Sequence, residues 1–168
     1  MQVLEGRLDV TDVDAFVERL DEIASAHDVT IQAFDGRYVA GWTHLERAVA
    51  LADRAIARGE NVARDRGVEI LLYAAGRRQI DRALELGVNE GETDAVVIVD
   101  GSDEEAERKA RERLESELAF VDRRPTLEDL DEGTLCAFFD ITESEREATD
   151  ATLEDLVCER VALLAVEK

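Results

Sequence analysis

Residues 67–87 read GVEILLYAAGRRQIDRALELG and combine an unbroken apolar run, a glycine and an amphipathic segment. Every residue from 70 to 75 is apolar or aromatic, which favours a strand covered on both faces, because a half-exposed strand would alternate. After Gly76 the apolar residues recur mostly at spacings of three and four, as on one side of a helix that Gly87 can end in the left-handed conformation. We therefore predict a central strand, a tight turn at 76–79 and a helix.

Two cations, Arg77 and Arg78, stand where that helix is predicted to begin. Arginine there opposes the helix dipole by roughly 0.3 to 1 kcal/mol each, so stability alone does not favour them. The arginines, the free N–H groups of a first helical turn and a glycine that lets a ligand approach the backbone together suggest an anion site, most naturally for phosphate. The alternative is that both arginines are solvated or pair with Glu69 or Asp81.

The chain has 168 residues, of which 45% are hydrophobic, and this is ample for one core. We predict a single domain over residues 1–168. No apolar run of about 18 residues is present and the N-terminus lacks a signal-like segment, which indicates a cytoplasmic protein without a membrane span. Cys136 and Cys158 show no CxxC spacing, so we expect two buried or half-buried thiols rather than a disulfide or a metal site.

The formal charge is −21, from 41 acidic against 20 basic residues. Periodic apolar stripes exclude disorder, so this charge lies on the surface of a folded protein. Arginine in place of lysine, many carboxylates and small apolar residues indicate a high-salt cytosol, as in halophilic archaea, where screening over about 3 Å removes most self-repulsion. The segment from Arg37 to Arg82 differs, since nine arginines and six acids give it a net charge of +3. That local excess points to an anionic partner for one face.

The other segments follow the two regular periodicities. Alternation predicts a strand at 4–10, and partial alternation at 29–34 fits either a second strand or part of an irregular segment. A second apolar run predicts a buried strand at 95–99. Apolar stripes predict helices at 13–27, 43–56, about 104–119 and in the C-terminal region. Trp42 and His44 lie where the second helix begins. They are either a packing tryptophan and a surface histidine, or two rings beside the Arg77 turn that stack on a base.

The C-terminal helix is predicted to be apolar beyond what a peripheral element needs to bury. Its apolar positions continue through 161–166 without a polar residue, and only Glu167 and Lys168 follow. Such a stripe favours a partner surface, although docking on the protein's own sheet explains it too.

No catalytic motif is present in the chain. It lacks GxGxxG, GxxxxGK[ST], HExxH and GxSxG, and two histidines and two cysteines leave few catalytic groups. We therefore predict a binding protein without catalytic residues, metal or cofactor. The alternative from another class is a small phosphate-ligand-binding protein or enzyme that uses the Gly76 turn.

The residues EILLYAAGRRQIDRALELGV at 69–88 resemble the small kinase-binding subunit of the KEOPS (EKC) complex, the family that includes the PRPK-binding protein (TPRKB). The shared pattern is an apolar run, a small residue with glycine at 75–76, and Arg-Gln-Ile at 78–80 opening a helix that ends before a glycine. The order of segments also agrees from end to end, with an alanine-rich helix before the motif, the DAVVIVD strand at 94–100 after it, and a C-terminal helix bearing Cys158.

The resemblance implies an α/β domain with a central mixed sheet and helices packed around it. It also implies two non-catalytic roles in forming threonylcarbamoyladenosine on tRNA, namely binding the atypical kinase/ATPase subunit and recruiting tRNA through its single-stranded 3′ CCA end. For RNA binding we expect residues at the turn and near it: Arg77, Arg78, Gln79, His44 and Tyr73. For kinase binding we expect residues of the C-terminal helix: Leu156, Val157, Arg160, Val161 and Leu164.

Overall fold

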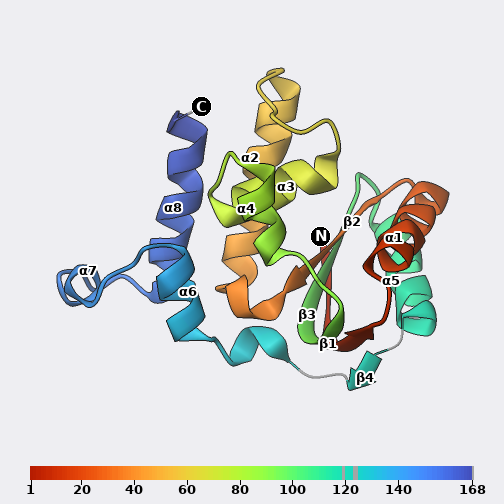
Figure 1. Cartoon of the computed structure of the whole chain (residues 1–168). Helices are drawn as coiled ribbons and strands as arrows, with labels where there is room; N and C mark the ends of the chain where they lie inside the picture. The colour runs from red at the N-terminus through yellow and green to blue at the C-terminus, as the bar shows by residue number, and fades with distance from the viewer. Residues whose placement is uncertain (119, 123–124, 168) are drawn as a thin grey trace. The chain divides into compact units, whose positions relative to one another are not determined.

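The computed structural model describes residues 1–118, 120–122 and 125–167 (Figure 1). The chain divides into two compact units, each built from two separate stretches of sequence. Unit 1 comprises Met1–Gly36 and Gly87–Thr126, and unit 2 comprises Arg37–Leu86 and Leu127–Lys168. The α/β class is confirmed, and the assignment of all 168 residues to one domain stays a prediction.

Unit 1 contains a four-stranded sheet in the order β2-β3-β1-β4. Its strands are β1 (Gln2–Val10), β2 (Thr30–Asp35), β3 (Gly91–Asp100) and β4 (Phe120–Asp122). Val99 of β3 lies opposite Gln2 of β1 and Ile31 of β2, and all the pairings described are antiparallel. The expectation of a mixed sheet is therefore wrong. The apolar run at 70–75, predicted to supply a central strand, is not part of the sheet.

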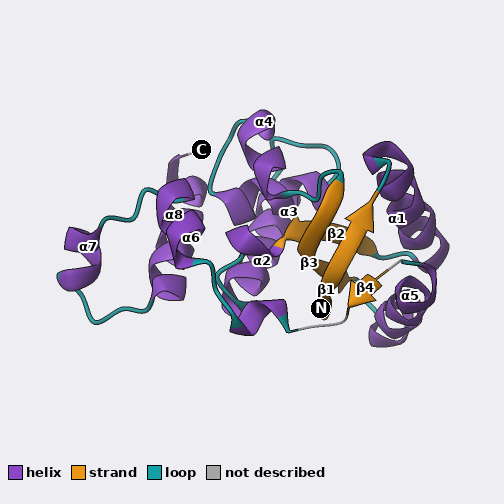
Figure 2. Ribbon diagram, turned by 60° about the horizontal axis from the view of Figure 1, so that its bottom comes forward, coloured by secondary structure: helices purple, strands orange, loops and turns teal. Residues whose placement is uncertain are grey.

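Two helices lie side by side on one face of this sheet (Figure 2). They are α1 (Val13–His27) and α5 (Glu104–Glu117). Alternate residues of β1, including Leu4 and Leu8, pack with Ile23 of α1 and Leu114 of α5 in one apolar cluster. The carboxylate of Asp12 caps α1 by accepting the N–H groups of residues 14 and 15. The predicted strands at 4–10, 29–34 and 95–99 and both predicted helices of this unit are confirmed within a few residues.

In unit 2 the apolar run at 70–75 is helical, so the predicted central strand is wrong. Helix α3 (Arg66–Ala75) begins after Asp65, whose carboxylate accepts the Val68 N–H at 2.9 Å. It ends at Gly76 in the left-handed conformation, with φ 62°. A run in which every residue is buried shows no periodicity, so a short buried strand and a buried helix look alike in sequence. The capping residues at the two ends of the run are what identify the helix.

Helices α2 (Trp42–Ala57), α3 and α8 (Leu153–Glu167) pack against one another at the centre of unit 2 (Figure 1). Buried alanines at 48, 52 and 55 let α2 approach its neighbours closely. The shorter elements are η1 (Gly36–Tyr38), α4 (Ile80–Ala83), η2 (Leu84–Leu86), η3 (Thr126–Glu128), α6 (Glu132–Phe138) and α7 (Glu143–Glu147). Within the described ranges, no helix has both the length and the apolar character that crossing a membrane requires.

Candidate functional site

Arg77 lies in the turn between α3 and α4, and several contacts hold its side chain in place. Its guanidinium lies 5.0 Å from the centre of the Phe138 ring and donates a hydrogen bond to the Phe138 carbonyl. One guanidinium nitrogen also lies 3.8 Å from a carboxylate oxygen of Asp140. The backbone N–H of Arg77 donates to Leu72, as expected where a helix ends in a left-handed glycine. Arg77 is therefore half-buried and ties the end of α3 to α6.

The next two residues of the turn, Arg78 and Gln79, are exposed. Arg78 makes no hydrogen bond or ion pair with any residue that the structure describes. Arg78 is thus solvated, which is one branch of the alternative stated above. It does not pair with Glu69, because Glu69 is fully buried and accepts the backbone N–H groups of Val62 and Ala63. Arg78 is a solvated cation that a ligand can reach.

Helix α4, which follows the turn, is shorter than predicted. It has four residues, and η2 continues it to Leu86. Gly87 does not end this segment in the left-handed conformation; it belongs to unit 1 and forms an isolated β-bridge with Phe34 of the same unit. A single turn develops little dipole, so the part of the phosphate-site prediction that depended on a helix N-terminus is wrong. What supports an anion site here is the charge and exposure of Arg78.

His44 and Tyr73, also predicted to contact RNA, are buried inside unit 2. His44 Nδ1 accepts the Ala40 N–H at 3.1 Å, and His44 Nε2 donates to the Ala74 carbonyl at 2.8 Å, which requires the neutral Nε2–H tautomer. Burial lowers the pKa of His44 to about 4, and the bond to Ala74 offsets only part of that shift. Neither ring is accessible for stacking on a base. We therefore correct the prediction for both residues, whose role here is structural.

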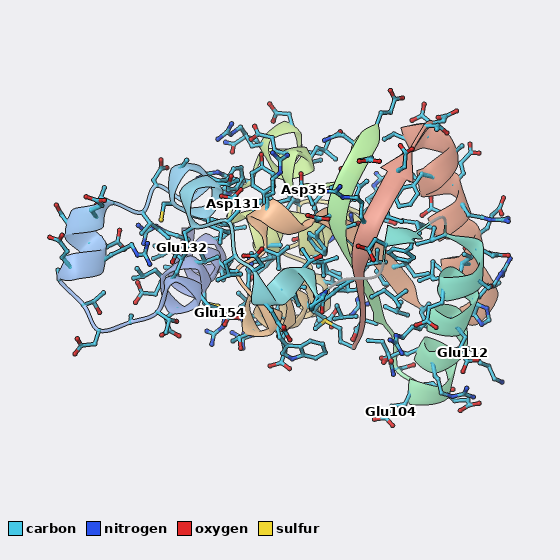
Figure 3. The ribbon with its side chains drawn as sticks, turned by 90° about the horizontal axis from the view of Figure 1, so that it is seen from below. Asp35, Glu104, Glu112, Asp131, Glu132 and Glu154 are labelled. Carbon is cyan, nitrogen blue, oxygen red and sulfur yellow. The ribbon has the colours of Figure 1, made fainter. Side chains whose placement is uncertain are left out.

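Trp42 borders a different part of unit 2. Its indole N–H donates to Glu46 at 3.2 Å, and the side chain lines a cavity of about 680 Å³ together with Glu132, Arg146 and Glu154. Figure 3 labels Glu132 and Glu154. None of the residues of the 76–79 turn lines this cavity. The structure therefore gives no support to the interpretation that Trp42 and His44 form a stacking platform beside the turn.

Glu154 is a residue that sequence reasoning missed. Gly41 at the start of α2 offers no side chain to cap the helix, and the Glu154 carboxylate of α8 accepts the His44 N–H instead, at 3.1 Å. Glu46, in the first turns of α2, accepts the Trp42 indole N–H and does not cap the helix. A local motif could not reveal this cap, because residues 44 and 154 are 110 positions apart.

Four of the five residues predicted to bind the kinase, Leu156, Val157, Val161 and Leu164, lie in the core of unit 2. Arg160, the fifth, donates to the Phe139 carbonyl at 3.1 Å and pairs with Glu145 at 2.8 Å. These contacts correct the prediction, since the buried side of α8 faces α2 and α3. Its exposed apolar residues are Leu163 and Val166, which are 49% and 81% exposed.

The two cysteines are free thiols. Cys158 is buried and Cys136 is half-buried, and this confirms the burial that the sequence predicts for them. Burial raises the pKa of Cys158. In the part of the chain that the structure describes, no three His, Cys, Asp or Glu side chains are grouped so that they could hold a metal ion.

A family model described as kinase binding protein CGI-121 matches residues 8–165. The chain belongs to this family. The match covers both units and supports the kinase-binding family that the motif at 69–88 resembles. As a CGI-121 protein, the chain has a kinase-binding, accessory role. A comparison with curated proteins gives no match. Arg78 and the exposed apolar residues of α8 are two features of this CGI-121 chain that a partner can contact without opening its core.

Proposed function

We propose that this protein is a non-catalytic, cytoplasmic subunit of the KEOPS complex, which forms threonylcarbamoyladenosine on tRNA. In this proposal it binds the atypical kinase/ATPase subunit and recruits tRNA through the 3′ CCA end. The CGI-121 match over residues 8–165 is the observation that carries the proposal. Arg78, which is exposed and has no partner among the residues that the structure describes, supports the RNA-binding part in a strongly acidic protein.

The exposed side of α8 is the proposed contact with the kinase. Asp155, Glu159, Leu163 and Val166 are all exposed, and their spacing of i, i+4, i+8 and i+11 places them along one side of the helix. The two apolar residues follow the two acids, so this side fits a partner with an apolar patch bordered by cations. The kinase surface is thus proposed on the side of α8 opposite to Val157 and Val161.

The exposed pair at the turn is the proposed contact with the CCA end. The guanidinium fork of Arg78 suits a phosphate group, and the amide of Gln79 can both donate to and accept from a base edge. Arg77, held against Phe138, positions the turn rather than binding the nucleotide.

Replacing Arg78→Glu should weaken the binding of intact tRNA to the level seen with tRNA trimmed of its CCA end. Binding of trimmed tRNA and the melting temperature should stay almost unchanged, because Arg78 has no partner among the described residues. Arg108→Glu is the matched control, since it makes the same charge change on α5, where Arg108 pairs with Glu105. A mobility-shift assay in KCl near the molar range measures the binding of intact tRNA and of trimmed tRNA.

Equal binding of intact and trimmed tRNA by the unaltered protein would contradict CCA recruitment, and early melting of Arg78→Glu would make Arg78 a structural residue. Turnover of a nucleotide by the isolated chain would favour the enzyme alternative.

A further inference from the structure

Three arginines, Arg47, Arg54 and Arg58, lie in a row along the exposed side of α2. Their spacing of i, i+7 and i+11 places them within about 20° of one line and spans about 16 Å along the helix axis. We call these three residues the arginine row. The residues beside the row on this side of the helix are Ala50 and Ala57, which are small, and Leu51, which is half-buried.

The arginine row makes no hydrogen bond or ion pair with any residue in the described part of the chain. Positions three and four residues away from each arginine along α2 hold no carboxylate. On α5 the basic residues are placed differently: Arg108 pairs with Glu105 and Glu112, and Arg113 pairs with Glu117. Figure 3 shows Glu104 and Glu112 among the acidic side chains of that helix. A row without acids is therefore unusual on a chain with 41 acidic and 20 basic residues.

The stability of α2 does not explain the row. The helix dipole favours cations in the last turn, which accounts for Arg54 and Arg58 but not for Arg47 in the second turn. Arg54 and Arg58 are also like charges at i, i+4, which costs a few tenths of a kcal/mol, roughly 0.2 to 0.5. An external anion would relieve that repulsion.

We propose that the arginine row binds the phosphate backbone of RNA, as a second contact separate from the Arg78 turn. Guanidinium groups bind phosphate oxygens in a forked geometry, and such contacts position RNA without reading its sequence. The proposal rests on the tRNA-recruiting function proposed above for the identity of the anion. It does not require the CCA end, because phosphates occur along the whole molecule.

The test uses a blunt-ended RNA duplex, which has phosphates but no single-stranded end. The whole protein is compared with Arg54→Gln/Arg58→Gln, and with Arg108→Gln/Lys109→Gln as a control that removes two paired charges from α5. The logarithm of the binding constant is measured against the logarithm of KCl concentration. The row variant should reduce the magnitude of the slope by about 2, roughly 0.9 for each phosphate that the protein no longer neutralises, whereas the control and Arg78→Gln should leave it unchanged.

No binding of the duplex by the unaltered protein in low salt, or equal slopes for the row variant and the control, would overturn the proposal. Loss of kinase capture by the row variant, with its RNA slope unchanged, would also overturn it and make the row a protein contact. Failure of the proposed function gives a different result. Trimming the CCA end would then have no effect on tRNA binding, while the row variant would still change the salt slope for the duplex. Circular dichroism checks that each variant is folded.

Discussion

His44 connects the start of α2 to the end of α3 through both of its ring nitrogens. Its pKa is lowered by burial from 6.5 to about 4 in the folded protein. Between these pH values the unfolded chain binds the proton that the folded chain excludes. The free energy of unfolding should therefore fall as pH drops from about 6.5 to about 4, by up to about 3 kcal/mol, and the full contribution of His44 should be present above pH 6.5.

The His44→Gln variant isolates this effect, because it removes the titrating group while the carboxylates remain. Urea unfolding followed by the fluorescence of Trp42, the only tryptophan, measures the free energy of unfolding of both proteins. The advantage of the unaltered protein over the variant should shrink as pH falls. An advantage that is the same at neutral pH and at pH near 4 would show that His44 is not buried neutral.

Gly76 combines a left-handed conformation with a close neighbour. Gly76→Ala should lower the free energy of unfolding by about 1 kcal/mol for the conformation alone. A further decrease is expected because the added carbon would lie 3.3 Å from the Arg160 carbonyl oxygen. Gly59→Ala is the control, since Gly59 has φ 69° and no heavy atom within 4 Å of such a carbon. Urea titration measures the free energy of unfolding of both variants. An equal decrease in the two variants would contradict a close packing of α8 on the turn.

At the scale of elements, two adjacent leucines of α8 have opposite environments. Leu163 is 49% exposed, whereas Leu164 is 2% exposed and packs in the core of unit 2. Leu164→Glu buries an unpaired carboxylate and should lower the free energy of unfolding by about 3 to 5 kcal/mol. Leu163→Glu should leave the melting temperature almost unchanged and weaken kinase binding by roughly 2 kcal/mol. Thermal unfolding and a pull-down with the kinase subunit measure the two effects.

Unaltered kinase capture by Leu163→Glu would move the proposed interface away from the exposed side of α8. Ile80 and Leu84, exposed on the segment after the Arg78 turn, would then be the next residues to test.

For the whole molecule, the charge of −21 makes stability depend on salt. The Debye length falls from about 30 Å at 0.01 M to about 3 Å at 1 M, so salt screens most repulsion between surface carboxylates. At neutral pH the melting temperature should rise steadily as KCl approaches the molar range. Near pH 4.3, the isoelectric point, the rise should be much smaller because little net charge remains to be screened. An equal rise at both pH values would contradict the predicted halophilic adaptation.

Local patterns in the sequence by themselves determined most of unit 1. Alternating residues such as Leu4 and Leu8 identified β1, and apolar stripes identified α1 and α5. The motif at 69–88 also indicated the family that the match over residues 8–165 shows. The residues that make up each of these signals lie close together in the sequence, so they can be recognised without knowing which segments pack against one another.

Tertiary structure alone decided which residues are accessible. The sequence marked His44 and Leu164 as binding residues, but both are buried because α2, α3 and α8, which are far apart in the chain, pack against one another. The same packing buries 70–75 as a helix and brings Glu154 to the start of α2. Burial depends on which distant segment covers a side chain. A periodic pattern shows that a residue is apolar, but it does not show whether the surface that the residue meets belongs to its own chain or to a partner.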